Sequence, residues 1–320
     1  MTDFQVNARG RLQHLITLDG LGRERIRDLL DRAVEVRTAC ARGITPQLLE
    51  GRTVINLFFE PSTRTRTSFE LAARRLGAQV VNFDISSSST SKGESLEDTL
   101  ATLEAMGADA FVVRHKVNGT PARLAASARH ASILNAGDGN HAHPTQGLLD
   151  ALTIRDRHAD FSSLRVTLCG DILHSRVARS DIHVLRALGT GEIRVCAPAP
   201  LLPAAEDMPG CTAFEDFDEA LEGSHVLIML RQQKERMSEA LVASDGEYFQ
   251  RYGLNSERLR RAAPDALVMH PGPMNRGVEI SAEVADGDQS AILTQVANGI
   301  PVRMAVLARL LEAPPAMHFA

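Results

Sequence analysis

Short apolar runs alternate with longer amphipathic stretches along almost the whole chain. Within the first half, the runs predict buried strands at residues 53–59, 79–84, 108–113 and 133–136. Apolar residues that recur every three or four positions predict helices at residues 23–42, 63–76, 96–106 and 121–130. Because strands and helices alternate one by one, this half is predicted to form β-α-β units around a parallel sheet.

The same alternation restarts after a long predicted helix at residues 144–157. Strands are predicted at 165–169, 193–197, 226–230 and 266–269, and helices at 177–188, 218–223, 256–262 and 294–311. The fold class is therefore predicted to be α/β, with two doubly wound parallel-sheet domains linked by long helices near residues 140–150. Ligands of such folds bind at the carboxyl ends of the strands, so polar residues at those ends are the candidate site.

Composition places the chain among ordinary globular proteins. It has 320 residues, of which 44% are hydrophobic and 23% are charged, so two domains with substantial cores are expected and disorder of the whole chain is excluded. The longest apolar runs are too short to span a bilayer, and residues 1–20 have no continuous apolar segment. We therefore expect a cytoplasmic protein without a secretory signal.

Charge and cysteine content narrow the function further. A formal net charge of −5 argues against a general nucleic-acid binder, so an anion site would need a local group of cations. The cysteines, Cys40, Cys169, Cys196 and Cys211, are widely spaced and contain no C-x-x-C pair, which argues against a disulfide framework or structural zinc. Only three of the 35 basic residues are lysines, at positions 92, 116 and 234.

The segment EPSTRTRTSFE at residues 60–70 joins the first predicted strand to its helix. Arginine in the first turn of a helix opposes the helix dipole unless an anion is bound there. Ser62, Thr63 and Thr65 add hydroxyl donors to the free backbone N–H groups, and Arg64 adds a guanidinium. These residues predict a phosphate site; the alternative is a serine cap followed by solvent-exposed arginines. Neither glycine-rich nucleotide signature is present, so the phosphate is expected to belong to a small molecule.

Three other predicted strands also end in polar residues. Arg114 and His115 follow one strand, Arg231 follows another, and His270-Pro-Gly-Pro273 follows a third. Since all of these ends lie at the ligand-binding edge of a parallel sheet, they predict a cationic cleft.

Two stretches have competing interpretations. His141-Ala-His143 has the spacing of a metal-ligand pair, but Pro144 starts a helix at once, so His143 is expected at a helix N-terminus, where a neutral imidazole is favoured. The serine-rich stretch before Lys92 is either a surface loop or a loop that closes over an anion.

Together these motifs closely resemble the catalytic chains of aspartate carbamoyltransferases, in the aspartate/ornithine carbamoyltransferase superfamily, over essentially the whole chain. The resemblance rests on Ser-Thr-Arg-Thr at 62–65, Val-Arg-His at 113–115, His-Pro-Thr-Gln at 143–146, Arg-Gln-Gln-Lys-Glu-Arg at 231–236 and His-Pro-Gly-Pro at 270–273. It implies domains at residues 1–145, completed by a C-terminal helix at 297–320, and at 146–296. These would bind carbamoyl phosphate and aspartate, respectively.

The implied reaction is carbamoyl phosphate plus L-aspartate giving N-carbamoyl-L-aspartate and phosphate, a step of pyrimidine synthesis. The resemblance implies carbamoyl-phosphate binding by Ser62, Thr63, Arg64, Thr65, Arg114, His143, Gln146, Gly272 and Pro273. It implies catalytic roles for Arg64, Thr65, Arg114 and His143, the last three polarising the carbamoyl oxygen. It implies aspartate binding by Lys92, Arg176, Arg231 and Gln233, and links between domains through Glu60 and Arg236.

The implied chemistry needs no metal or other cofactor, because the aspartate amine attacks the carbamoyl carbon directly and the leaving phosphate can accept its proton. Family members form homotrimers with shared active sites, so Lys92 would come from a neighbouring subunit. An extension like residues 1–12 accompanies, in some bacterial relatives, a regulatory or dihydroorotase-like chain.

Two other functions stay open from the sequence. The first is a carbamoyltransferase with another acceptor such as ornithine, although the His-Pro-Cys-Gln and His-Cys-Leu-Pro motifs expected of that enzyme are absent. The second is a non-catalytic regulatory paralogue, which is disfavoured because every expected site position is filled.

Overall fold

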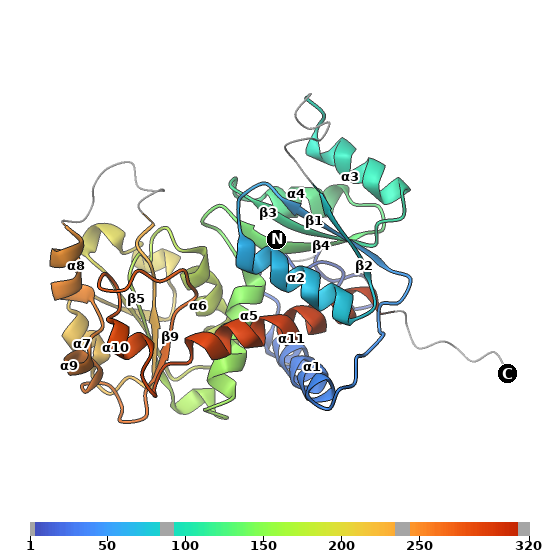
Figure 1. The fold of residues 1–320 in the computed structure, drawn as a ribbon. Helices are drawn as coiled ribbons and strands as arrows, with labels where there is room; N and C mark the ends of the chain where they lie inside the picture. The colour runs from blue at the N-terminus through green and yellow to red at the C-terminus, as the bar shows by residue number, and fades with distance from the viewer. Residues whose placement is uncertain (1–3, 84–92, 234–243, 313–320) are drawn as a thin grey trace. The chain divides into compact units, whose positions relative to one another are not determined.

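A computed structural model of the chain describes residues 4–83, 93–233 and 244–312. Two compact units are present (Figure 1). The first unit comprises residues 1–145 and 299–320, and the second comprises residues 146–298. The second unit is thus one continuous segment inserted into the first.

The first unit contains a four-stranded sheet in the order β2-β1-β3-β4, with every neighbouring pair parallel. Its strands are β1 (Thr53–Phe58), β2 (Gln79–Phe83), β3 (Ala110–His115) and β4 (Ser132–Asp138). Its helices are α1 (Arg23–Ala41), α2 (Thr63–Arg75), α3 (Leu96–Ala105) and α4 (Thr120–Ser127). Strands β3 and β4 are almost wholly buried, which explains why they read as continuous apolar runs.

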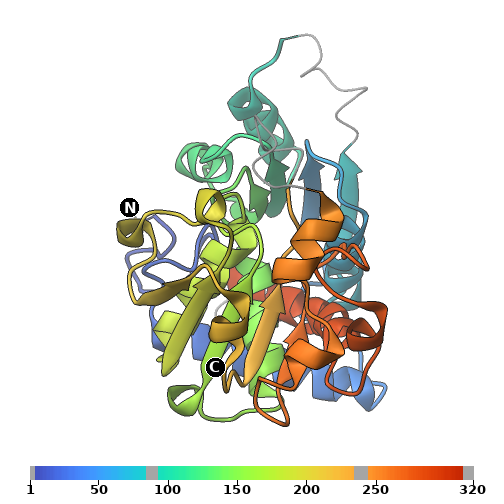
Figure 2. The same cartoon turned by 90° about the vertical axis from the view of Figure 1, so that its left-hand side faces the viewer.

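The second unit contains a five-stranded parallel sheet in the order β7-β6-β5-β8-β9, whose strands stand side by side in Figure 2. The strands are β5 (Arg165–Cys169), β6 (Glu192–Cys196), β7 (Cys211–Phe214), β8 (Val226–Met229) and β9 (Leu267–Met269). The helices are α6 (Arg176–Leu188), α7 (Phe217–Leu221), α8 (Asp245–Tyr252), α9 (Ser256–Leu259) and α10 (Ala282–Ala285). Two longer helices, α5 (Pro144–Arg155) and α11 (Ile292–Leu311), are divided between the units. Short 3-10 turns are η2 (Phe161–Ser163), η3 (Ala199–Leu201) and η4 (Ala205–Asp207).

The predicted fold class is confirmed, because both sheets are parallel and helices connect their strands. Cys169 and Cys196 lie opposite each other on neighbouring strands and are fully buried with free thiols. The sequence did not predict β7 or α8. As an edge strand of four residues with two exposed positions, β7 has no continuous apolar run. In contrast, α8 has a readable signal, the capping box of Ser244 and Glu247.

Strand order identifies where each sheet can bind a ligand. In the first unit the chain places β2 on one side of β1 and then β3 on the other. In the second unit it builds outward from β5 to β7 and then returns to place β8 on the other side of β5. Such reversals open a crevice at the carboxyl ends of the two central strands. The ligand-binding edges are therefore β1 and β3 in one unit and β5 and β8 in the other.

Both long helices near the unit boundary contribute residues to each unit. α5 begins in the first unit and continues into the second, whereas α11 begins in the second unit and ends in the first. In the first unit, the guanidinium of Arg303 lies 5.0 Å from the ring centre of Phe69 on α2. The last turns of α11 lie beside α1 and are joined to it by ion pairs of Arg309 with Asp28, at 2.5 Å, and of Glu312 with Arg32 (Figure 1).

The free edge of β4 is covered by an N-terminal segment that contains a buried histidine. His14 is 2% exposed, and its Nδ1 accepts a hydrogen bond from the Ile133 N–H at 3.0 Å. The next residue, Leu15, donates its own N–H to the carbonyl of Ile133. Burial lowers the pKa of His14 from 6.5 to about 4, and the charge of Glu104 offsets only part of this shift.

This histidine predicts a loss of stability in mild acid. Unfolded His14 binds a proton below pH 6.5, whereas folded His14 stays neutral until about pH 4. The stability is therefore complete above pH 6.5 and falls by about 3 kcal/mol in total as the pH drops towards 4. The comparison is urea unfolding of the wild type and of His14→Asn, which keeps an acceptor but cannot titrate. Parallel curves of unfolding free energy against pH would contradict this role.

Candidate active site

In the first unit, the N-terminus of α2 offers unpaired donors directly after β1. Its N-cap residue, Ser62, is extended and makes no side-chain cap hydrogen bond, and no acidic residue lies in the first turn. Thr65 is buried, whereas Arg64 is exposed and has no carboxylate partner among the described residues. Partial desolvation lowers the pKa of the Arg64 guanidinium from its usual value. The helix start therefore has a free guanidinium, a free hydroxyl and backbone N–H groups, which together suit an anion.

Arg114 lies at the carboxyl end of β3, beside this helix start. Phe58, the last residue of β1, pairs in register with Arg114. The Nε of Arg114 lies 2.9 Å from a carboxylate oxygen of Glu60, and its Nη1 donates to the carbonyl of Ala136 at 3.3 Å. The resemblance implies that Glu60 and Arg236 link the domains, but Arg236 lies outside the described residues. In this structure Glu60 forms an ion pair with Arg114 within the first unit.

The loop from β4 to α5 is built around a buried carboxylate, Asp138. Its Oδ1 accepts hydrogen bonds from the Ala142 N–H and the Asn135 amide, each at 3.0 Å. Its Oδ2 accepts from the Gly119 N–H at 2.9 Å and lies 3.2 Å from Nδ1 of His141. These hydrogen bonds hold in place the loop that carries His143.

His143 is 4% exposed and directly precedes Pro144, the first residue of α5. The predicted position at a helix N-terminus is confirmed. The two histidines of the H-x-H pair have different surroundings, because His141 binds Asp138 and is half exposed. Across the described part of the chain, no three His, Cys, Asp or Glu side chains are grouped to hold a metal ion.

In the second unit, Arg176 and Arg231 follow the two central strands. Arg176 is the first residue of α6, is 7% exposed, and lies in a first turn without acidic residues. Arg231 follows β8, and its Nη1 donates to the carbonyl of Gln232 at 3.2 Å. The strand ends approach closely at Gly170, where an added Cβ would lie 2.2 Å from the carbonyl oxygen of Leu230. Glycine at position 170 therefore allows the loops that carry the two arginines to approach this closely.

Asp171 joins these two loops through hydrogen bonds to both of them. It is fully buried, and its Oδ1 accepts from the N–H of His174 and lies 2.9 Å from that ring's Nδ1. Its Oδ2 accepts from the N–H of Gln233 at 3.1 Å, while the Gln233 side chain donates to the carbonyl of His174. Gln233 is thus used in holding the loops through both its backbone and its side chain.

Gln146 and the turn at His270 form the remaining part of the site in this unit. The Nε2 of Gln146 lies 3.1 Å from both oxygens of Asp150. His270 accepts from the Gly272 N–H at Nδ1, so its Nε2 carries the proton and donates to Glu279 at 3.1 Å. Because the Gly272 N–H is occupied, the turn through Gly272 and Pro273 offers carbonyl acceptors rather than donors.

The three helices that carry candidate residues at their N-termini, α2, α5 and α6, have no acidic residue in the first turn. The first turn contains an acidic residue in α1, α3, α7, α8, α9 and α10 but none in α2, α5 or α6, which carry candidate residues. α4 and α11 also lack one, so the feature is not specific by itself. At α2, α5 and α6, however, the helix dipole is left without its usual protein counter-charge, as expected where anionic ligands bind.

The predicted site residues therefore fall into two groups, one in each unit. The first contains Ser62, Thr63, Arg64, Thr65, Arg114 and His143, and the second contains Gln146, Arg176, Arg231, Gln233, Gly272 and Pro273. Lys92 lies outside the described residues. The supporting carboxylates Asp138, Asp150 and Asp171 were not predicted. Asp171 could have been found, because it follows a strand as closely as the predicted arginines do.

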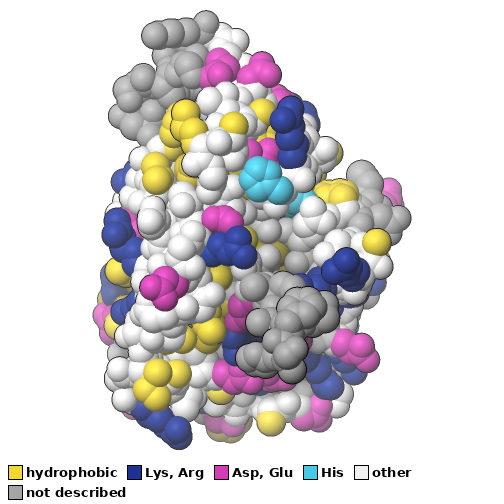
Figure 3. Space-filling model, turned by 90° about the vertical axis from the view of Figure 1, so that its right-hand side faces the viewer, with side chains coloured by type: hydrophobic (Ala, Val, Ile, Leu, Met, Phe, Trp, Pro, Cys, Tyr) yellow, Lys and Arg dark blue, Asp and Glu magenta, His cyan; other side chains and the backbone are white. Residues whose placement is uncertain are grey.

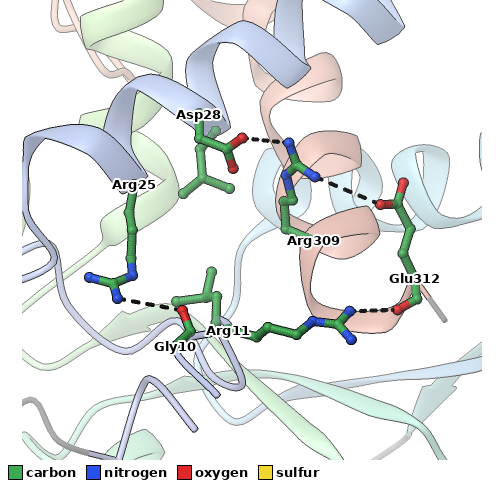
Figure 4. A pocket seen from close by; sticks show the side chains of 8 residues that line it. Gly10, Arg11, Arg25, Asp28, Arg309 and Glu312 are labelled. Carbon is green, nitrogen blue, oxygen red and sulfur yellow. Dashed lines mark hydrogen bonds and ion pairs between the residues drawn. The ribbon is translucent and has the colours of Figure 1, made fainter. Parts of the chain in front are cut away.

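The first unit also contains a pocket of about 230 Å³, lined mainly by charged residues. Its lining residues come from the N-terminal segment, α1 and the end of α11. In Figure 4, Arg309 lies between Asp28 and Glu312, while Arg11 and Arg25 donate to the carbonyls of Glu312 and Gly10. These bonds tie the N-terminal segment to the end of α11. None of the predicted site residues lines this pocket.

On the face drawn in Figure 3, basic and acidic side chains are interspersed, and neither charge predominates. Among the described residues, no helix is both long and apolar enough to cross a membrane.

Two family models match the chain in succession. The aspartate/ornithine carbamoyltransferase, carbamoyl-P binding domain, matches residues 13–156. The aspartate/ornithine carbamoyltransferase, Asp/Orn binding domain, matches residues 162–310.

Relatives and solved structures match almost the whole chain. The aspartate carbamoyltransferase catalytic subunit of Xanthomonas campestris pv. campestris (strain B100) is 58% identical over 314 residues, covering 97% of this chain and 100% of the relative. Aspartate transcarbamoylase from Trypanosoma cruzi, solved with N-(phosphonacetyl)-L-aspartic acid, matches with 32% identity and a TM-score of 0.84, covering 97% and 99% of the two chains. Ornithine carbamoyltransferase from Pyrococcus furiosus also has a TM-score of 0.84, with 26% identity and coverage of 94% and 98%. The fold alone therefore does not distinguish the acceptor.

Proposed function

The chain belongs to the aspartate/ornithine carbamoyltransferase family, and we propose that it transfers the carbamoyl group of carbamoyl phosphate to L-aspartate. The products are N-carbamoyl-L-aspartate and phosphate, in pyrimidine synthesis. The choice of aspartate rests on the 58% identity to the Xanthomonas campestris aspartate enzyme, compared with 26% to the Pyrococcus furiosus ornithine enzyme.

Carbamoyl phosphate binds, in this proposal, at the start of α2. The single observation that carries it is a helix N-terminus without an acidic first turn, whose Arg64 has no carboxylate partner among the described residues. Ser62, Thr63 and Thr65 supply further donors to the phosphate. A short helix start without glycine binds one compact phosphate and leaves the carbamoyl group accessible.

Arg114, His143 and Thr65 are proposed to stabilise the developing oxyanion. The aspartate amine forms a C–N bond with the carbamoyl carbon, and the C–O bond to phosphate then breaks with its electron pair. The amine proton passes to the leaving phosphate. Glu60 and the Asp138 loop support the proposal because they fix Arg114 and the loop before His143 in advance of the reaction. Donors that are already in place need no reorganisation when charge develops.

Aspartate is proposed to bind through Arg176, Arg231 and Gln233 at the ends of β5 and β8. Two arginines match the two carboxylates of aspartate, whereas ornithine has an ammonium at the corresponding end of its side chain. The carbamoyl amide is proposed to donate to the side-chain oxygen of Gln146 and to the carbonyls at Gly272 and Pro273.

A cytoplasmic homotrimer with shared sites completes the proposal, with Lys92 acting in the site of a neighbouring subunit. The free thiols of the cysteines are compatible with a reducing compartment. Whether a regulatory or dihydroorotase-like chain joins a larger assembly stays a prediction. Sedimentation of a fully active monomer would contradict the shared sites.

Phosphate release by the purified chain tests the reaction. With carbamoyl phosphate present, we expect aspartate to be carbamoylated and ornithine to give only the background rate. Saturable release with ornithine alone would identify the other acceptor class. Binding of carbamoyl phosphate without turnover of either amino acid would instead support a regulatory paralogue.

A further inference from the structure

Two carboxyl groups meet inside the second unit, on α5 and α6. Asp150 is 1% exposed and Asp181 is fully buried. No N–H or O–H group of the described residues donates to either oxygen of Asp181, and the carboxyl of Asp150 is its charged neighbour. Two buried ionised carboxylates side by side would repel each other without compensation, so one member of the pair must hold a proton. Burial, and then the charge of Asp150, raise the pKa of Asp181 far above its usual range.

The surrounding donors decide which member of the pair is ionised. Oδ1 of Asp150 accepts from the Nε2 of Gln295 at 2.7 Å and from the Nε2 of Gln146 at 3.1 Å. Its Oδ2 also lies 3.1 Å from the Nε2 of Gln146. Amide donors stabilise a negative charge on Asp150, whereas Asp181 has no comparable donor among the described residues. The proton is therefore on Asp181, which donates it to Asp150.

This charge fixes the orientation of the Gln146 amide. An ionised carboxylate only accepts hydrogen bonds, so the Gln146 amide must present Nε2 to Asp150, which turns Oε1 away from it. An oxygen acceptor is the group that a carbamoyl NH₂ needs. If Asp150 were neutral, the amide could rotate and present its own NH₂ to the substrate instead.

The same carboxylate reaches the turn at His270. Gln295 is 1% exposed, and while its Nε2 donates to Asp150, its Oε1 accepts from the His270 N–H at 2.8 Å. Asp150 is thus directly hydrogen-bonded to Gln146, and it is linked to the turn that carries Gly272 through two successive hydrogen bonds by way of Gln295. Both parts of the proposed carbamoyl-amide site depend on one buried charge.

We propose that Asp181 stays protonated at neutral pH and, by donating to Asp150, makes this pair a positioning device for Gln146 and the His270 turn. The consequence for catalysis rests on the proposed function, because that function gives Gln146 and the turn their substrate. Asp150 and Asp181 are positioning residues and do not touch the substrate.

Replacing Asp181 by leucine or asparagine tests whether Asp181 is protonated and donates to Asp150. Leucine has the same branching at Cγ but is larger and has no donor, so we expect kcat/KM for carbamoyl phosphate to fall by about 10- to 100-fold. Asparagine keeps an N–H donor in place of the acid O–H, so we expect it to restore kcat/KM to within about threefold of the wild type. Equal damage by both variants, with unchanged thermal unfolding, would overturn the proposal because it would mean that an ionised Asp181 is required.

A double-mutant cycle tests the positioning of Gln146. Asp150→Asn and Gln146→Ala are each expected to lower kcat/KM for carbamoyl phosphate. The loss in the double variant should be clearly smaller than the product of the two single losses, because Asp150 acts partly through Gln146 and partly through the His270 turn. Fully multiplying losses would overturn the link between Asp150 and Gln146.

An infrared readout separates this proposal from the proposed function. The wild type at pH 7 should show the C=O band of a buried protonated carboxyl, and Asp181→Asn should lack it. Presence of this band in a chain without activity would leave the proton assignment standing while refuting the reaction. Absence of the band from an active wild type would overturn the proton assignment alone.

Discussion

Replacing Arg64 by alanine is expected to lower kcat by about 10³-fold without destabilising the protein. Two charge-assisted hydrogen bonds to the phosphate, each contributing about 1.5–3 kcal/mol, would be lost together. The folded chain gains rather than loses from the change, because Arg64 has no carboxylate partner among the described residues and opposes the dipole of α2. We expect the free energy of unfolding to stay equal or to rise by up to about 1 kcal/mol.

The matched control is Arg66→Ala, because Arg66 is exposed on the same helix and differs in its position relative to the helix start. It should keep near-normal turnover. Steady-state kinetics and urea unfolding of both variants are the measurements. A loss below tenfold in Arg64→Ala, or an equal loss in Arg66→Ala, would be inconsistent with a phosphate contact at Arg64.

Replacing Arg176 by alanine is expected to raise KM for aspartate by about 10²-fold, through loss of one charge-assisted contact to a carboxylate. KM for carbamoyl phosphate should change little, since Arg176 belongs to the group of residues proposed to bind the acceptor. The measurement is a pair of saturation curves, one for each substrate.

Arg186→Ala is the control for this second variant, because Arg186 lies in the last turn of the same helix, away from its N-terminus. It should leave both KM values near those of the wild type. If Arg176→Ala raised both KM values equally, Arg176 would be acting on the fold of the site and not on aspartate.

The sequence predicted the two sheets well because parallel strands buried on both faces leave an unambiguous apolar pattern. β5 and the strand from Ala110 to His115 illustrate this, with nearly every central position buried. The pattern carries less information at an edge. β7 has one neighbour and two exposed positions, so its residues could not be distinguished from a loop.

Candidate residues at strand ends were predictable for a topological reason, since parallel strands bring their carboxyl ends to one edge. Their partners were not predictable, because a contact such as Glu60 with Arg114 depends on distances that only the folded chain defines. Asp181 is the instructive case. It occupies the buried face of α6 between Ala178 and Leu185, where an apolar residue is expected, so its polarity was a readable anomaly.

The second unit is a single segment, residues 146–298, and its entry and exit are bonded to each other. Gln295 and Asn298, where the chain leaves the unit, donate to Asp150 and Asp156 of the helix on which it enters. In genetic terms the half that is proposed to bind the acceptor is a cassette with adjoining ends. Exchange of this cassette by recombination is expected to change the acceptor amino acid while leaving the half that is proposed to bind phosphate unchanged.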